Sequence, residues 1–427
     1  MHPPLTVGYC MNVHPATDLP SVLHNLENYA AAVRRGLVEA GTLAADEPLG
    51  IGLWLSDPVI QQLYDVESRR ALSETLGRLQ LTPFTVNGFP QKNFHQKVVK
   101  HAVYELTWWS PERLRYTRQL ADCLSELLPE GLTGSISTLP IAWNTPRPSA
   151  DQIDEAAENL RSAAEHLRQL EDRSGRRIVL AIEPEPGCVI GDCPSARLFF
   201  LRHLLKGPQA EVCRRYLTIC HDVCHASVMR EDQRQQIQAY RDCGIRIGKV
   251  QVSSAIHVDW DSMTPDSRAQ AFAQVRRFAE DRYLHQTTTR NGPVGSVRFV
   301  EDLSQLIEAI DVPERLVGNW TIHFHVPIQA GHLGPLGTTR AAIDEVLDAL
   351  YTAPGTPISN GRMAEPVEYK RLMRSDWLEQ SFTGHFEIET YAWSVMPDDY
   401  RRGGLVEDLV AEIQYFTGRY QSRLSPA

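Results

Sequence analysis

Five short runs of strand-forming residues in the second half of the chain stop at polar residue types that can bind metal ions. They span residues 178–185, 217–225, 249–253, 321–327 and 385–390. In a parallel α/β barrel the carboxyl ends of all strands meet at one open rim, so side chains that follow such strands converge. Carboxylates and imidazoles brought together in this way suit a divalent transition metal. The pattern therefore predicts a parallel barrel and a cluster of ligating side chains at its mouth.

The bulk properties of the chain agree with a large enzyme-sized fold. It has 427 residues, 42% of them hydrophobic, which allows one barrel with insertions or two domains. A formal net charge of −10 and a pI of about 5.9 argue against a nucleic-acid partner. No run approaches the roughly 20 apolar residues of a membrane span. The first five residues carry no signal sequence, so we expect a cytoplasmic protein without direct membrane insertion.

Strand and helix patterns alternate along the first half of the chain, as an α/β barrel requires. Strands are expected at 6–12, 50–55, 83–89 and 134–139, and helices at 19–40, 58–79, 110–128 and 150–173.

With the five runs above, this makes nine candidate strands for an eight-stranded barrel. We assign 249–253 as strand seven and 386–391 as strand eight, which leaves 321–326 in an insertion that folds back over the rim; the reverse assignment is the alternative. The expected organisation is a single domain over 1–427, a (β/α)8 TIM barrel with an insertion at about 256–335.

Glu183 is the first candidate ligand. Pro184 and Pro186 lack amide donors and cannot continue a central strand, so Glu183 is the last inward residue of its run. A carboxylate on that face is costly unless it is paired or bound to a metal. A salt bridge to an arginine at the rim is the alternative. We predict a metal ligand that can also carry a proton.

Asp222 and His225 form a second candidate pair. Asp222 ends a strand, and His225 follows three residues later where the chain turns, so both can approach one metal or two adjacent ones. His221 points the opposite way and is expected to be structural. Thiolate ligation by Cys220 or Cys224 is an alternative, but buried small residues beside the site are favoured.

Two further pairs use the alternation of side chains along a strand. His323 and His325 share one face of an otherwise apolar run, and Glu387 and Glu389 share one face of the last strand. Glu389 lies nearer the rim and is the better metal ligand. Glu387 could orient a ligand or act as a general base.

Other polar residues lie at neighbouring strand ends, where they could contact a substrate. Gln251 occupies the strand-seven position, as a weak ligand or a hydrogen-bonding group. The predicted metal ligands are Glu183, Asp222, His225, His323, His325 and Glu389, with Glu183, Glu389 and His225 as catalytic residues. The predicted substrate-binding residues are Asn12, His14, His95, Gln251 and Glu387.

The order Glu183, Asp222-x-x-His225, His323-x-His325 and Ile388-Glu389-Thr390 resembles the xylose-isomerase-like barrel superfamily, which includes sugar isomerases, epimerases and the endonuclease IV family. The resemblance implies that the carboxylates after strands five, six and eight bind a divalent metal. It also implies that His225 meets a second metal or the substrate. His323-x-His325 resembles the D-x-H pair of endonuclease IV, with His replacing Asp. The chain departs from the superfamily at Gln251, where a metal-binding His is usual. The implied cofactor is one to three ions of Zn, Mn, Fe or Mg.

A more specific resemblance covers nearly the whole chain and is to the EboE-type metabolite traffic family. It rests on the motifs at 9–15, 87–90 with His95, 134–140, 183–187, 249–255, 323–327, 336–339 and 387–391. Membership implies a role in bacterial gene clusters that handle secondary metabolites. It does not assign a reaction.

Three functional hypotheses follow. The first is a metal-dependent isomerase, epimerase or hydrolase that acts on a sugar- or cyclitol-like intermediate, because a metal can polarise an oxygen while a carboxylate moves a proton. The second is a non-catalytic barrel that binds or delivers a metabolite, and the third is a multinuclear iron oxidase. The expected partners are a small polyol- or sugar-like substrate, pathway proteins and a second copy of the chain. Nucleic acid is excluded by the acidic balance.

Overall fold

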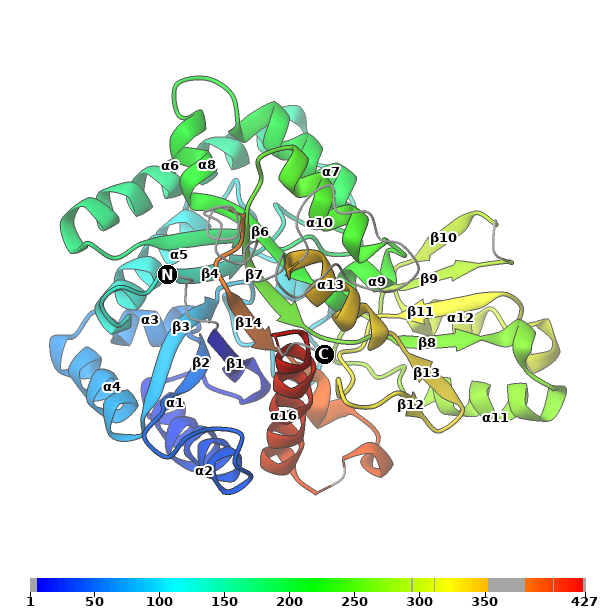
Figure 1. Cartoon of the computed structure of the whole chain (residues 1–427). Helices are drawn as coiled ribbons and strands as arrows, with labels where there is room; N and C mark the ends of the chain where they lie inside the picture. Colours follow the sequence, from blue (N-terminus) through cyan, green and yellow to red (C-terminus); the bar gives the residue numbers. More distant parts are fainter. Residues whose placement is uncertain (1–5, 293–294, 311, 352–380, 402, 425–427) are drawn as a thin grey trace.

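Eight parallel strands close into a barrel in the order β1-β14-β7-β6-β5-β4-β3-β2 (Figure 1). The computed structural model describes residues 6–292, 295–310, 312–351, 381–401 and 403–424; residues 1–5, where no signal sequence is expected, lie outside this range. The barrel strands are β1 (Thr6–Cys10), β2 (Leu49–Trp54), β3 (Leu81–Asn87), β4 (Gly134–Thr138), β5 (Ile178–Ile182), β6 (Leu217–Asp222), β7 (Ile247–Val252) and β14 (His385–Ile388). The predicted (β/α)8 fold is confirmed.

Helices cover the outside of the barrel and connect its strands (Figure 1). Their apolar faces pack against the strands in one continuous core. They are α1 (Leu19–Asn25), α2 (Ala31–Glu39), α3 (Asp57–Gln62), α4 (Val66–Arg78), α5 (Pro111–Leu127), α6 (Ala150–Ser174), α7 (Cys193–Phe199), α8 (Ala210–Tyr216), α9 (Val223–Val228), α10 (Gln233–Asp242), α13 (Ala341–Tyr351) and α16 (Leu405–Leu424). No helix in the described ranges is long and apolar enough to cross a bilayer.

The single helix expected at 58–79 is two helices. The chain leaves the helical path after α3, and Asp65 starts α4 by accepting a hydrogen bond from the Ser68 amide at 2.9 Å. An aspartate in this position satisfies an amide that has no partner within the helix, so a new helix begins there.

A second, antiparallel sheet follows β7 in the chain, in the order β10-β9-β11-β8-β13-β12 (Figure 1). Its strands are β8 (Ile256–Asp259), β9 (Thr287–Arg290), β10 (Val297–Val300), β11 (Asn319–Ile322), β12 (His332–Leu333) and β13 (Leu336–Thr338), and it has its own core with α11 (Pro265–Arg276) and α12 (Leu303–Glu308). Strands seven and eight are therefore the runs that the sequence assigned to them, and 321–326 belongs to the insertion. The single-domain organisation with bounds of about 256–335 stays a prediction.

A charged pair lies inside the barrel, below the rim. Lys249 of β7 and Glu387 of β14 are both fully buried, with Lys249 Nζ 2.5 Å from Glu387 Oε2. Burial alone would lower the pKa of Lys249, but the carboxylate of Glu387 raises it above its usual value. Gly52 of β2 leaves the space for Glu387, because a Cβ at this position would overlap Glu387 Oε1. The barrel therefore encloses a buried ion pair below its rim.

Lys249→Met should lower the free energy of unfolding by about 3–5 kcal/mol, because it leaves the charge of Glu387 buried without a partner. The double variant Lys249→Met, Glu387→Leu should regain most of that loss. Equilibrium unfolding in guanidinium chloride measures the free energy of unfolding of the single and the double variant. Lys92→Met is the matched control, since Lys92 pairs with Glu105 at 2.7 Å while both side chains are 57% exposed, and its loss should be about 0–1 kcal/mol. A cost for Lys249→Met no larger than that of the control would contradict the argument.

Candidate metal centre

Three carboxylates converge at the rim of the barrel. Glu183 follows β5, Asp222 ends β6 and Glu389 follows β14. One oxygen of each lies within 4.8 Å of the others, and all three side chains are buried. The sequence predicted this convergence from the three strand ends, and the structure brings these side chains together.

The three carboxylates differ in their charge state. Burial, together with the charges of Glu389 and Asp222, raises the pKa of Glu183 well above its usual range. Burial and the charges of Asp222 and Glu387 do the same to the pKa of Glu389. Burial would also raise the pKa of Asp222, but His225, His325 and two hydrogen bonds lower it overall. Without a cation, Asp222 is therefore the ionised member and the two glutamates favour their protonated forms.

Hydrogen bonds hold Asp222 and Glu389 in place. The His225 amide donates to Asp222 Oδ1 at 2.9 Å, and Ser253 Oγ donates to the same oxygen at 2.8 Å. Asn12 Nδ2 and Asn87 Nδ2 both donate to Glu389 Oε1, at 2.6 and 2.9 Å. One oxygen of each carboxylate is therefore used by the protein, and the other is left to face the site.

Three histidines complete the cluster, and each uses Nδ1 to contact the protein. His225 Nδ1 lies 3.0 Å from the Pro184 carbonyl, His325 Nδ1 lies 3.1 Å from the Glu389 carbonyl, and His323 Nδ1 lies 2.6 Å from Gln286 Oε1. A carbonyl oxygen can only accept, so Nδ1 carries the proton in each ring. The lone pair of Nε2 is then free, which is the tautomer that binds metals.

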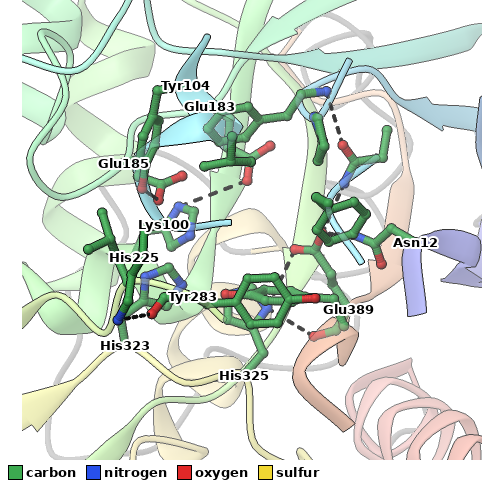
Figure 2. A pocket seen from close by; sticks show the side chains of 17 residues that line it. Asn12, Lys100, Tyr104, Glu183, Glu185, His225, Tyr283, His323, His325 and Glu389 are labelled. Carbon is green, nitrogen blue, oxygen red and sulfur yellow. Dashed lines mark hydrogen bonds and ion pairs between the residues drawn. The ribbon is translucent and has the colours of Figure 1, made fainter. Parts of the chain in front are cut away.

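Four lone-pair atoms of this cluster are buried without a hydrogen-bond partner in the described structure. They are Glu183 Oε2, Asp222 Oδ2, His323 Nε2 and His325 Nε2. Each buried acceptor left without a partner costs about 1–3 kcal/mol. Figure 2 shows Glu183, His225, His323, His325 and Glu389 directed into one pocket. Acceptors without donors, gathered in one place, fit a bound cation.

The possible ligand sets overlap. Besides the three carboxylates, ligand atoms within 4.8 Å of one another occur in the sets Asp222–His225–His325, Glu185–His225–His323 and Cys224–His323–His325. Each imidazole has one free nitrogen and could bind one ion at a time, whereas Asp222 belongs to two of these sets. Burial and the charge of Asp222 raise the pKa of the Cys224 thiol well above its usual value, so this thiol, like the two glutamates, would have to lose a proton to bind a cation.

Glu185 is a site residue that the sequence did not single out. Its Oε1 accepts hydrogen bonds from Tyr104 Oη at 2.6 Å and from Gln286 Nε2 at 2.9 Å. Burial raises its pKa, although His225 and these two hydrogen bonds oppose the shift. Its spacing of two residues from Glu183 was the available signal. Tyr104 comes from the loop between β3 and α5, and Gln286 comes from the insertion. No local sequence pattern connects either residue with Glu185.

His14 and His95 were predicted to bind substrate, but neither lines the pocket. The ring of His14 stacks on Tyr29 with centroids 4.5 Å apart, and burial lowers its pKa to about 3. His95 Nε2 donates to the Asn12 carbonyl at 2.8 Å. Both rings support the segment that carries Asn12, which does line the pocket.

Gln251 and Glu387 also lie outside the pocket lining. Gln251 Oε1 accepts a hydrogen bond from Cys220 Sγ at 2.9 Å, and Glu387 is bound to Lys249. The geometry gives no support to a substrate contact for these two residues. His221 points away from the site, as expected, with Nε2 2.7 Å from Gln233 Oε1.

The pocket above the cluster has a volume of about 520 Å³, including its open mouth. One wall is the loop between β3 and α5, and the facing wall belongs to the insertion. Lys100 of the loop ties the two walls together, with Nζ 2.6 Å from Asp302 Oδ2 and 2.8 Å from the Tyr283 carbonyl. The insertion therefore supplies both His323 and His325 and one side of the pocket.

Comparison with known proteins adds solved structures of the same general architecture. No protein-family model matches the sequence, and no curated protein matches it. Similar solved structures include a D-tagatose 3-epimerase-like protein (11% identity, 98% of this chain and 100% of that chain, TM-score 0.45). A second is the probable 3-DHS dehydratase AsbF from Bacillus anthracis (12%, 96% and 98%, 0.43), and a third is the IOLI protein with a bound zinc atom (10%, 98% and 99%, 0.42). At 10–12% identity, a similar chain path carries no information on the reaction. The assignment to the EboE-type family stays a prediction.

Metal binding should release protons, because Glu183 and Glu389 have raised pKa values and must ionise to bind a cation. The apparent metal affinity should therefore rise with pH. In the metal-free protein these raised pKa values favour folding at low pH and lose that contribution as pH rises, so the stabilisation by metal should grow with pH. Titration calorimetry in buffers of different ionisation enthalpy counts the protons. Glu183→Gln should release fewer, and equal release by the two proteins would contradict this account.

Replacing both His323 and His325 with Ala should lower the metal content of the purified protein while the far-ultraviolet circular dichroism stays unchanged. The reason is that both Nε2 atoms lack a protein partner, so the substitution removes two ligand atoms; the loss of the two Nδ1 hydrogen bonds should lower the unfolding temperature without changing the secondary structure. Elemental analysis and thermal unfolding measure the two effects. His14→Ala is the control, because it removes a buried imidazole outside the pocket. An unchanged metal content with a collapsed stability would show that the two histidines are structural.

Proposed function

We propose that the chain is a metal-dependent enzyme of the isomerase, epimerase or hydrolase type, and that it acts on a sugar- or cyclitol-like intermediate. The observation that carries the proposal is the set of four buried lone-pair atoms without partners beside two carboxylates of raised pKa. Strongly perturbed acids that lie together in a pocket are typical of active sites. We further propose a cytoplasmic role in secondary metabolism, with pathway proteins or a second copy of the chain as partners.

Glu183, Asp222 and Glu389 would hold the principal ion, and His225, His323 and His325 would complete its coordination or hold a second ion that shares Asp222. A divalent ion at this position supplies a Lewis acid for a substrate carbonyl or hydroxyl oxygen. Carboxylate and imidazole ligands together are compatible with Zn, Mn or Fe, and Mg remains within the expected set.

Proton transfer would fall to the glutamates. Glu183 is the better general acid or base, because Oε2 has no protein partner, whereas Oε1 of Glu389 accepts two amide hydrogen bonds. Burial and the charges of Glu389 and Asp222 raise its pKa, so Glu183 keeps its proton at a higher pH than a free carboxyl group and can act as a general acid. His225 Nδ1 lies 3.9 Å from Glu183 Oε1, beyond hydrogen-bond distance, and contacts the Pro184 carbonyl instead. The buried walls of the pocket would keep bulk water from the transferred proton.

Two other functions have a specific observation in their favour. A non-catalytic barrel that binds or delivers a metabolite is favoured by Gln251, a neutral amide bonded to Cys220 at a position where a ligating His is expected. A multinuclear iron oxidase is favoured by the overlapping ligand sets around Asp222.

The deciding experiment is Asp222→Asn in a strain that lacks the gene. The substitution is nearly isosteric and preserves the N-cap of α9, so the fold should survive, while metal content and complementation should both be lost. Asp232→Asn is the matched control, because Asp232 caps α10 through the Gln235 amide at 2.9 Å and lies away from the carboxylates. Full complementation by metal-free Asp222→Asn protein would reject the metalloenzyme in favour of the binding barrel.

A further inference from the structure

We infer that the substrate carries an apolar group beside its metal-binding oxygen atoms. This inference rests on the proposed function, because it needs the metal centre to hold the polar end. It adds what the rest of the substrate must be: a body with few hydroxyl groups, so that a sugar- or cyclitol-like end bears an apolar substituent.

The first observation is the chemistry of the pocket walls. Phe89, Phe94 and Val103 line one side from the loop between β3 and α5, and Leu284 of the insertion and Tyr391 after β14 line other parts. Phe94 and Tyr391 form an edge-on aromatic pair with centroids 6.2 Å apart. The apolar surface thus comes from three separate segments of the chain and encloses the space above the metal centre. Such walls favour an apolar ligand surface.

The second observation is that most polar groups on the walls are already bound to the protein. Lys100 Nζ is held by Asp302 and by the Tyr283 carbonyl. Tyr104 Oη donates to Glu185 at 2.6 Å and receives Gln286 Nε2 at 2.8 Å. These groups would have to give up short internal contacts in order to bind a substrate hydroxyl.

Few polar atoms remain for the substrate. Among the described lining residues, the buried side-chain atoms without a partner, apart from the proposed ligands, are Asn12 Oδ1 and Tyr283 Oη. Figure 2 shows Tyr283 at the front of the pocket, on the same side as Glu389 and His325. A polyol body would bury several hydroxyl groups without partners, at about 1–3 kcal/mol each. Asn12 Oδ1, Tyr283 Oη and the hydroxyl group of Tyr391, which also lines the pocket, can receive a few substrate hydroxyl groups, and the body that lies against the apolar walls is otherwise apolar.

The experiment compares three hydroxamic acids that share one metal-binding head: acetohydroxamate, benzohydroxamate and gluconohydroxamate. Binding to the protein with its purified metal content is measured by titration calorimetry. Benzohydroxamate should bind at least about tenfold more tightly than acetohydroxamate, since filling an apolar pocket by a few carbon atoms is worth about that factor. Gluconohydroxamate should bind no more tightly than acetohydroxamate.

A pair of variants tests whether the walls cause the difference. Val103→Thr places a hydroxyl group on the apolar wall with little change in shape and should reduce the advantage of benzohydroxamate several-fold. Val98→Thr is the control, because Val98 lies in the same loop, is 54% exposed and is not part of the lining. It should leave all three affinities unchanged.

The outcomes distinguish a failure of the proposed apolar substituent from a failure of the proposed metal centre. Equal affinities for the three compounds, or tightest binding of gluconohydroxamate, would overturn the apolar substituent and leave the metal centre intact. An equal loss in both variants would likewise overturn it. Binding by none of the three would overturn the accessible metal centre of the proposed function, and the present inference with it.

Discussion

The mutual repulsion of Glu183, Asp222 and Glu389 is the constraint around which the rim of the barrel is organised. These three residues lie at the carboxyl ends of parallel strands in one closed barrel, so the backbone brings the carboxylates together whatever their charge. In a buried site this repulsion is weakly screened. The surrounding donors reduce this repulsion only in part. Asn12 and Asn87 donate hydrogen bonds to one oxygen of Glu389, and Ser253 donates to one oxygen of Asp222. Protonation of the glutamates or binding of a cation must relieve the repulsion that remains.

The parts of the site that the sequence predicted are those fixed by a strand. Glu183, Asp222 and Glu389 lie at strand ends, and the alternation of side chains along a strand puts His323 and His325 on one face. The two-residue period and the position at a strand end were therefore enough to predict these site residues. Assignment of the last strand to 386–391 also followed from local pattern and chain length. The separate core of the second sheet did not, because it depends on pairing between segments far apart in the chain.

The parts that the sequence missed depend on loops. Glu185 gains its role from Tyr104 and Gln286, which belong to the β3–α5 loop and the insertion. His14 follows a strand, as the ligands do, but the chain turns after β1 and buries its ring against Tyr29. His225 lies three residues after β6 and His14 lies four residues after β1, so residue type and distance from a strand end do not separate a ring inside the site from one outside it. The direction of the side chain is set by tertiary contacts that a single sequence does not reveal.

The closing strand has a consequence for when the metal can enter. β14 lies between β1 and β7 in the barrel but follows the whole insertion in the chain, and Glu389 comes directly after it. During synthesis Glu183 and Asp222 leave the ribosome well before Glu389, and until β14 inserts, no three-carboxylate site exists. Capture of the ion would therefore be a late event that follows barrel closure. The metal that occupies the site would then reflect the ions available where folding is completed, and no earlier stage of the nascent chain could select it.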